Sequence, residues 1–281
     1  MITIADLAQA KRNGEKIAAV SCYDYTTARL VSQTDAQMLL VGDSAAQVVL
    51  GHDSTLPATM DFMVAITAGV RRGAPEKFLV ADMPFLSYQP SIAEAVTNAG
   101  RFIVEAGAQM VKIEATGDHL NVIEAVSDAG IAVMAHIGIR PQRIGRTGRF
   151  KAEATTAEMA AGLVSLADQM VDSGASMLLV EGTAAEVAQL VTERSEVLVI
   201  SCGSGSGCDG QILIAPDILG MTIGRGPKFA KSYGDMGGQM IAAFQEYCQE
   251  VFGGTYPDAE HSYHMKAGEL EKLQKLLTEE K

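Results

Sequence analysis

Short apolar runs rich in Val, Ile, Leu and Met recur along the chain and alternate with longer Ala-rich stretches. Some runs, such as the two copies of MLLV, are apolar at every position. This pattern is typical of strands buried on both faces in a parallel sheet. It predicts strands over Ile17–Cys22, Met38–Gly42, Phe78–Ala81, Met110–Ile113, Ala132–Ile137, Met177–Val180, Val197–Ser201 and, with the weakest apolar signal, Asp217–Met221.

The stretches between these runs place apolar residues three and four positions apart, which is helical spacing. They predict helices over Asp61–Arg72, Ser91–Ala106, His119–Ala129, Thr156–Ser173 and Ala184–Arg194. Ser91, Thr156 and Asp61 occupy the positions expected of N-caps.

Repeated alternation of strand and helix predicts an α/β fold, a (β/α)8 TIM barrel formed by a single domain over residues 1–281. The rival is an open doubly wound sheet, which loses support because no G-x-G-x-x-G follows the first strand. The N-terminal segment MITIADLAQAKRNGEK predicts an additional helix. From about Tyr256 the chain predicts a C-terminal helical extension, an appendage over 256–281 with a stripe of leucines.

Composition narrows the class of protein. The formal net charge is −12 and no run of Lys and Arg exceeds two residues, which disfavours a nucleic-acid partner. The N-terminal segment lacks the features of a secretory signal. No apolar run is long enough for a membrane span, so no membrane partner is expected. The four cysteines form no C-x-x-C pair, which fits a reducing cytoplasm.

Candidate chemistry lies where the predicted strands end. In (β/α)8 barrels the active site occupies the carboxyl ends of the strands. A lone carboxylate there is often a cap or an ion-pair partner, and a lone histidine is more often part of the core. Ionisable groups at five successive strand ends are harder to explain separately. The candidate residues are Asp43, Ser44, Asp82, Lys112, Glu114, His136 and Glu181.

The direction of the side chains and the ligand chemistry further define this candidate site. Residues two apart on a strand share a face, so Lys112 and Glu114 are both expected to point into the barrel. Asp43, Asp82 and Glu114 offer hard oxygen ligands, which suit Mg²⁺. A bound Mg²⁺ could be chelated by an α-keto acid and would stabilise the enolate that forms when the adjacent carbon loses a proton.

Seven segments then indicate a family. In order along the chain these are LLVGDSAAQVVLGHDSTLPATMD, FLVADMPFLSY, AGAQMVKIE, MLLVEG, DGQIL, PKFAKSY and YPDAEHSYHM. Together they resemble the ketopantoate hydroxymethyltransferases (3-methyl-2-oxobutanoate hydroxymethyltransferases), from about Thr3 to Met265.

The resemblance implies an activity and its cofactors. The family uses Mg²⁺ and 5,10-methylenetetrahydrofolate to transfer a one-carbon unit to α-ketoisovalerate, giving ketopantoate for pantothenate and coenzyme A synthesis. It also forms large homo-oligomers, commonly decamers, so the C-terminal appendage is expected to serve an interface.

The resemblance also implies a role for each candidate residue. Asp43 and Asp82 match the metal-binding aspartates, and Glu114 matches a carboxylate that reaches the metal through water. Ser44 and Lys112 match contacts to the substrate carboxylate, and His136 matches a histidine close to the substrate. Glu181 matches the carboxylate proposed to transfer the proton.

Two loops depart from the family pattern. After His136 the family carries a stretch similar to GGYKVQG, whereas this chain reads RPQRIGRTGRFKAEA. After the seventh strand the family tends to GIGAG, whereas this chain reads SCGSGSGCDGQ. Both differences in sequence leave open how folate binds to this chain. Arg225, Lys228 and Lys231 are candidates to attract the glutamate tail of folate, and a solvated basic loop is an equally good interpretation.

Other functions stay open on sequence grounds. A Mg²⁺-dependent aldolase or lyase acting on another α-keto acid is one, although such lyases usually carry a catalytic cysteine in a motif of the KKCGH kind, which is absent. An aldolase that uses free formaldehyde is a second. A non-catalytic paralogue acting as a binding module is the third, and retention of all the candidate site residues argues against it.

Overall fold

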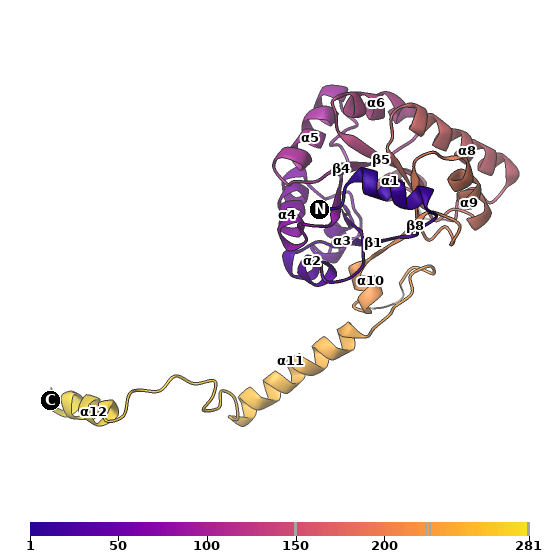
Figure 1. Cartoon of the computed structure of the whole chain (residues 1–281). Coiled ribbons are helices and arrows are strands. Elements are labelled where there is room, and N and C mark those ends of the chain that lie inside the picture. The colour runs from indigo at the N-terminus through magenta and orange to yellow at the C-terminus, as the bar shows by residue number, and fades with distance from the viewer. Residues whose placement is uncertain (149–150, 223, 225, 280–281) are drawn as a thin grey trace.

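A computed structural model of the 281-residue chain describes residues 1–148, 151–222, 224 and 226–279. Eight parallel strands close into a barrel in the order β1 to β8, with every strand paired to its neighbours in sequence and β8 paired to β1 (Figure 1). The predicted (β/α)8 barrel is therefore confirmed. The strands are β1 (Ile17–Ser21), β2 (Met38–Val41), β3 (Phe78–Asp82), β4 (Met110–Glu114), β5 (Ala132–Gly138), β6 (Met177–Glu181), β7 (Leu198–Cys202) and β8 (Gly210–Ile214).

Helices surround the barrel and extend beyond it (Figure 1). They are α1 (Ile4–Arg12), α2 (Tyr25–Val31), α3 (Ala45–Val48), α4 (Met60–Gly73), α5 (Ile92–Val104), α6 (Leu120–Asp128), α7 (Ile144–Thr147), α8 (Ala157–Asp172), α9 (Ala185–Arg194), α10 (Ala215–Leu219), α11 (Met236–Gly253) and α12 (Glu269–Glu279). Short 3₁₀ turns, η1 and η2, cover Gly117–His119 and Pro141–Arg143. Ser91 and Thr156 cap their helices as predicted, but the N-cap of α4 is Thr59 rather than Asp61, which lies in the first turn.

The eighth predicted strand was wrong. The segment Asp217–Met221 overlaps the short helix α10, and β8 lies earlier in the chain. Gly210 opens β8 because a Cβ there would meet the backbone oxygen of Ile17 at 2.6 Å, so only glycine allows β8 to approach β1 this closely. Pro216 then stands in the first turn of α10, where its missing N–H costs nothing.

Two apolar layers hold the barrel together. The outer layer packs strand side chains such as Val111 and Val180 against the surrounding helices. The inner layer fills the barrel and includes one methionine from each of four strands, Met38, Met110, Met134 and Met177. Leu7 of α1 joins this inner layer, so α1 closes the amino-terminal end of the barrel. The opposite, carboxyl-terminal end is left for polar side chains.

The C-terminal extension differs from the rest of the chain. In Figure 1, α11 and α12 lead away from the barrel, and neither helix has a buried residue. Ile241, Phe244 and Phe252 of α11 have exposed fractions of 68%, 64% and 86%. The helical extension is thus confirmed in kind, although helix α11 begins well before Tyr256.

Candidate active site

Polar side chains replace the apolar filling at the carboxyl end of the barrel. Met110 belongs to the inner layer, and side chains alternate along a strand, so Lys112 and Glu114 also point inward, as predicted. The same alternation carries His136 inward after Met134, and Glu181 inward after Leu179. Strand register puts Asp82 beside Lys112 and Glu114 beside His136. The pleat of four strands therefore assembles this cluster.

All seven predicted site residues line one cavity of about 340 Å³ at this end of the barrel. The cavity also has apolar walls, to which Leu40, Leu179 and Ile212 contribute. A concave, mostly apolar site with a few convergent polar groups is the usual form of a small-molecule site. The sequence prediction that these residues meet at one rim is thus matched by their positions.

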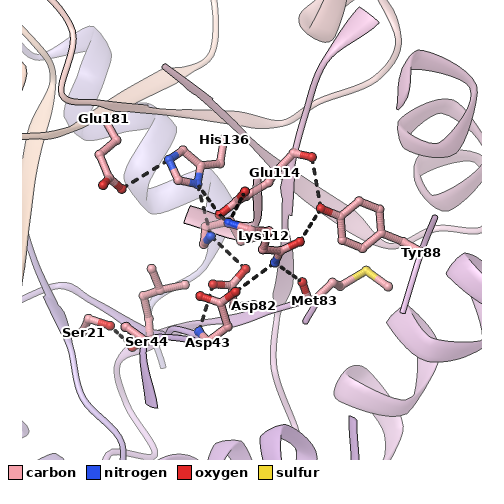
Figure 2. Close-up of polar contacts among 12 residues, drawn as sticks. Ser21, Asp43, Ser44, Asp82, Met83, Tyr88, Lys112, Glu114, His136 and Glu181 are labelled. Atoms are coloured by element: carbon pink, nitrogen blue, oxygen red, sulfur yellow. Dashed lines mark hydrogen bonds and ion pairs between the residues drawn. The ribbon is translucent and has the colours of Figure 1, made fainter. Parts of the chain in front are cut away.

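Lys112 is the cation at the centre of the cluster (Figure 2). Its Nζ lies 2.8 Å from Asp82 Oδ1 and 3.3 Å from His136 Nδ1. Burial disfavours the charged ammonium, but the carboxylates of Asp82, Asp43 and Glu114 outweigh burial and raise the pKa of Lys112. Lys112 therefore stays protonated and can donate a hydrogen bond to His136.

That hydrogen bond determines the tautomer of His136. Burial, followed by the charge of Lys112, lowers the pKa of His136, so its imidazole is neutral near pH 7. Because Nδ1 accepts from Lys112, the remaining ring proton belongs on Nε2. His136 Nε2 lies 3.3 Å from Glu181 Oε2, although it is not aligned there as a full hydrogen bond. Figure 2 shows Glu181 on the far side of the imidazole from Lys112.

The carboxylates outnumber their cations. Burial raises the pKa of Asp82 to about 7, with Lys112 opposing the shift and Asp43 adding to it. Burial likewise raises the pKa of Glu114 well above its usual value. The backbone N–H of Asp43 donates to Asp82 Oδ2 at 3.0 Å, which holds the two aspartates together. Such a surplus of buried negative charge favours a bound cation.

Comparisons with known proteins identify the family of this chain. The model of the ketopantoate hydroxymethyltransferase family matches residues 1–259. A 3-methyl-2-oxobutanoate hydroxymethyltransferase of Clostridium novyi is 41% identical over 271 residues, covering 96% of this chain and 98% of the relative. The enzyme of that name from Halalkalibacterium halodurans is 39% identical over 273 residues, covering 97% and 98%. This chain belongs to the ketopantoate hydroxymethyltransferase family.

Solved structures support the fold at low sequence identity. A 2,3-dimethylmalate lyase, described as a member of the PEP mutase/isocitrate lyase superfamily, matches with a TM-score of 0.60 at 16% identity over 100% of both chains. A phosphonopyruvate hydrolase matches with a TM-score of 0.61 at 12% identity, covering 100% of this chain and 97% of the other. At these identities the likeness concerns the barrel alone.

A divalent cation fits the donors that the ketopantoate hydroxymethyltransferase fold brings together. Asp82 Oδ1 is buried and has the Lys112 ion pair but no well-aligned hydrogen bond. Asp43 adjoins it through the backbone contact to Asp82. Within the described residues no group of three or more His, Cys, Asp or Glu side chains is arranged as a complete metal centre. Mg²⁺ needs no such group, because it commonly binds one or two carboxylates and completes its shell with water and substrate oxygens.

Two residues of the site escaped the sequence analysis. The Gln142 side chain is buried in η2, and its Nε2 donates to Asp43 Oδ2 at 2.9 Å. Tyr88, in the loop after β3, donates from its hydroxyl to Gln142 Oε1 at 2.8 Å. Neither residue directly follows a strand, so the pattern of polar residues at strand ends does not indicate them.

The loop after β5 departs from the family pattern in sequence, yet its first turns complete the site. Gly138 ends β5 with a φ of 91°, a left-handed conformation in which a Cβ would collide with the backbone oxygen of Glu181. From there η2 leads Gln142 back over the rim. Arg149 and Phe150, farther along this loop, lie outside the described residues.

The loop after β7 builds a wall of the cavity. Ser204 Oγ accepts from the Thr183 N–H at 3.0 Å and donates to the Val180 oxygen at 2.9 Å, so it ties this loop to β6. Cys202 lines the cavity, and burial raises its pKa well above the usual value, which favours the unreactive thiol. Gly203, with a φ of 70°, lies against the ring of Phe229, another lining residue.

The segment that carries the basic residues proposed for the folate tail borders the cavity through Pro227 and Phe229. Lys228 and Lys231 are exposed in the segment that follows β8 and α10. Lys231 Nζ lies 4.8 Å from the centre of the Tyr233 ring. Arg225 lies outside the described residues. Their role in folate binding stays a prediction.

Proposed function

We propose that this chain transfers a hydroxymethyl group from 5,10-methylenetetrahydrofolate to 3-methyl-2-oxobutanoate, giving 2-dehydropantoate, with Mg²⁺ as cofactor. Family membership supplies the reaction class. The observation that carries the proposal to this chain is the shared cavity, in which Asp43, Asp82, Lys112, His136 and Glu181 all take part. No other described group of residues combines a small-molecule cavity with this chemistry.

Asp43 and Asp82 would hold the Mg²⁺, with Glu114 close by to reach it through water. When bound, Mg²⁺ supplies positive charge that stabilises an enolate on the keto acid. The ammonium of Lys112 and the hydroxyl of Ser44 suit the substrate carboxylate. Ser44 Oγ is positioned by the Tyr23 hydroxyl at 2.8 Å. Leu179 and Ile212 suit the branched apolar end of the substrate.

Glu181 is the proposed general base that removes the proton from C3 of the keto acid. The Glu181 side chain is 19% exposed and borders the cavity. The resulting carbon nucleophile attacks the methylene carbon of an iminium formed from the folate, and water then releases tetrahydrofolate. His136 directs its Nε2 toward Glu181, so a neutral imidazole lies beside the proposed base.

A second part of the proposal concerns assembly. We propose that the chain self-associates, with a homodecamer as the expected state. The exposed apolar side chains of α11, Ile241 and Phe244 among them, support this because monomers rarely leave such a helix face uncovered. No nucleic-acid or membrane partner is proposed. Among the described residues no helix is long and apolar enough to cross a membrane.

Product analysis tests the proposed reaction. Purified protein is incubated with 3-methyl-2-oxobutanoate, 5,10-methylenetetrahydrofolate and Mg²⁺, and 2-dehydropantoate is measured by mass spectrometry. We expect product only when all three are present, loss with EDTA and recovery with excess Mg²⁺. Product from free formaldehyde at the same rate without folate would instead identify an aldolase. Absence of product from a folded protein in every reaction would contradict the proposal.

A further inference from the structure

Gln142 connects the carboxyl ends of four successive strands, β2 to β5. Its side-chain Nε2 donates to Asp43 Oδ2, after β2, and to the Met83 oxygen, after β3, each at 2.9 Å. Its backbone N–H donates to the Glu114 carboxylate, at 3.0 Å to Oε2 and 3.2 Å to Oε1. One residue of the loop after β5 thus contacts two of the three carboxylates proposed to serve the metal.

The chemistry of these partners fixes the side-chain amide in one orientation. Asp43 Oδ2 and the Met83 oxygen are both acceptors, so the NH₂ group must face them. The amide oxygen then faces Tyr88, whose hydroxyl donates at 2.8 Å. The Tyr88 hydroxyl also lies 3.1 Å from the Glu114 backbone oxygen. Glutamine is the side chain that satisfies this set, since glutamate would turn an acceptor toward Asp43 and methionine would donate nothing.

Burial makes these contacts consequential. The exposed fractions of Gln142 and Tyr88 are 4% and 1%, so water does not compete for their hydrogen bonds. A hydrogen bond to a buried charged group contributes more than one between neutral groups. The Gln142 contact also occupies Oδ2 of Asp43, which sets the rotation of the carboxylate and hence the direction of its other oxygen.

We infer that Gln142 is a positioning residue that orients the Asp43 and Glu114 carboxylates for cation binding. The Tyr88 hydroxyl fixes the orientation of the Gln142 amide. The inference rests on the proposed function, because it assumes that these carboxylates serve a divalent cation. It adds a residue from the loop that departs from the family pattern. Through Gln142, that loop is part of the metal site.

The test is divalent-cation binding by the purified full-length protein in the absence of any substrate. Mn²⁺ is the probe, and its bound fraction is followed by electron paramagnetic resonance during titration. The variants are Gln142→Met, Gln142→Glu and Tyr88→Phe. Gln169→Met serves as the matched control, because Gln169 is exposed on α8 and bonds only within its own helix.

We expect Gln142→Met to weaken Mn²⁺ binding by roughly 10- to 100-fold, the effect of losing a hydrogen bond to a buried charge. Tyr88→Phe should weaken it less, and the double variant should fall short of the product of the two single effects, because both substitutions break one linkage. The control should bind as the wild type does. Circular dichroism and thermal unfolding show which variants remain folded, and Tyr88→Phe carries the test if Gln142→Met does not fold.

The outcomes separate the inference from the proposed function. If folded Gln142→Met and Tyr88→Phe bind Mn²⁺ with the same affinity as the wild type, the positioning role is overturned and the proposed reaction is unaffected. Absence of Mn²⁺ binding in the wild type would overturn both. Weaker Mn²⁺ binding in both Gln142→Glu and Gln142→Met, with melting temperatures within the range of the control, would support the inference. A purely structural role predicts lower melting temperatures and unchanged Mn²⁺ affinity.

Discussion

His136 Nε2 and Glu181 Oε2 face each other at 3.3 Å across the paired ends of β5 and β6. On the other side of the imidazole, Nδ1 accepts from the protonated Lys112 at 3.3 Å. The neutral ring therefore lies between a buried ammonium and a carboxylate at the edge of the cavity. Glu181 thus borders the cavity beside a neutral imidazole, where the proposed function needs a base.

Glu181→Gln should abolish exchange of the C3 hydrogen of 3-methyl-2-oxobutanoate and leave Mg²⁺-dependent binding of the keto acid nearly unchanged. The amide keeps the size of the side chain but cannot take a proton. Loss of a general base typically costs about 10²- to 10⁴-fold in rate. Exchange is followed by proton NMR in D₂O, and binding by calorimetry. The exposed Glu186→Gln on α9 is the control. Exchange at the wild-type rate in Glu181→Gln would remove Glu181 from this role.

Lys112→Met should destabilise the protein by about 3–5 kcal/mol, because it leaves a buried carboxylate without its partner. The pKa of Asp82 should rise further once the ammonium is gone, so the loss should be smaller at pH 6 than at pH 8. Urea unfolding at both pH values measures this, with the exposed Lys272→Met on α12 as the comparison. An equal loss at both pH values would show that Asp82 does not take up the proton.

Asp82 should make the metal-free protein less stable as pH rises from about 4 to about 7, and the lowered pKa of His136 contributes in the opposite direction. In this range unfolded Asp82 is ionised, whereas the folded carboxyl retains its proton because burial raises its pKa to about 7. The folded state then binds more protons than the unfolded state, so unfolding becomes easier with rising pH, by up to about 1.4 kcal/mol per pH unit for one proton. Glu114, whose pKa is also raised, acts in the same direction.

Thermal unfolding in EDTA across this pH range measures the slope, and saturating Mg²⁺ should flatten it, since a cation favours the ionised carboxylates. An Asp82→Asn variant should show a shallower slope than the wild type in EDTA. The same slope in Asp82→Asn and in the wild type in EDTA would contradict the protonation state assigned to Asp82.

Charged substitutions on α11 should reduce the assembly without unfolding the barrel. Ile241→Glu and Phe244→Glu place charges on a helix face that is already exposed in the single chain, so the barrel core loses nothing. Light scattering coupled to size exclusion should show smaller particles than for the wild type. The polar neighbour Gln245→Glu serves as the control. Particles of unchanged size in both variants would show that α11 does not form the interface.

The barrel and its central cluster were predictable because both follow from short-range rules. Apolar runs such as MLLV indicate buried parallel strands, and the two-residue period along a strand places Lys112 and Glu114 on one face. Parallel strands bring their carboxyl ends to one rim, so Asp82 and His136 could be expected there without coordinates. These inferences need no knowledge of how loops fold.

The residues that escaped prediction depend on loops and on close packing. Gln142 reaches Asp43 from 99 positions away in sequence because the left-handed Gly138 and the turn η2 bring its loop back over the rim. No periodicity encodes such a contact. The eighth strand was misplaced for a related reason. Strand β8 begins with Gly210 and Gln211, which are not apolar, and Gly210 allows β8 to approach β1 closely.

The most direct test of the site is an anomalous difference map from crystals of the protein grown with Mn²⁺ and 3-methyl-2-oxobutanoate. We expect one strong peak within coordination distance of carboxylate oxygens of Asp43 and Asp82, with the keto acid bound to the cation and its carboxylate facing Lys112 and Ser44. A peak elsewhere, or a keto acid bound in this cavity with no cation beside it, would contradict the assignment of Asp43 and Asp82 as metal ligands.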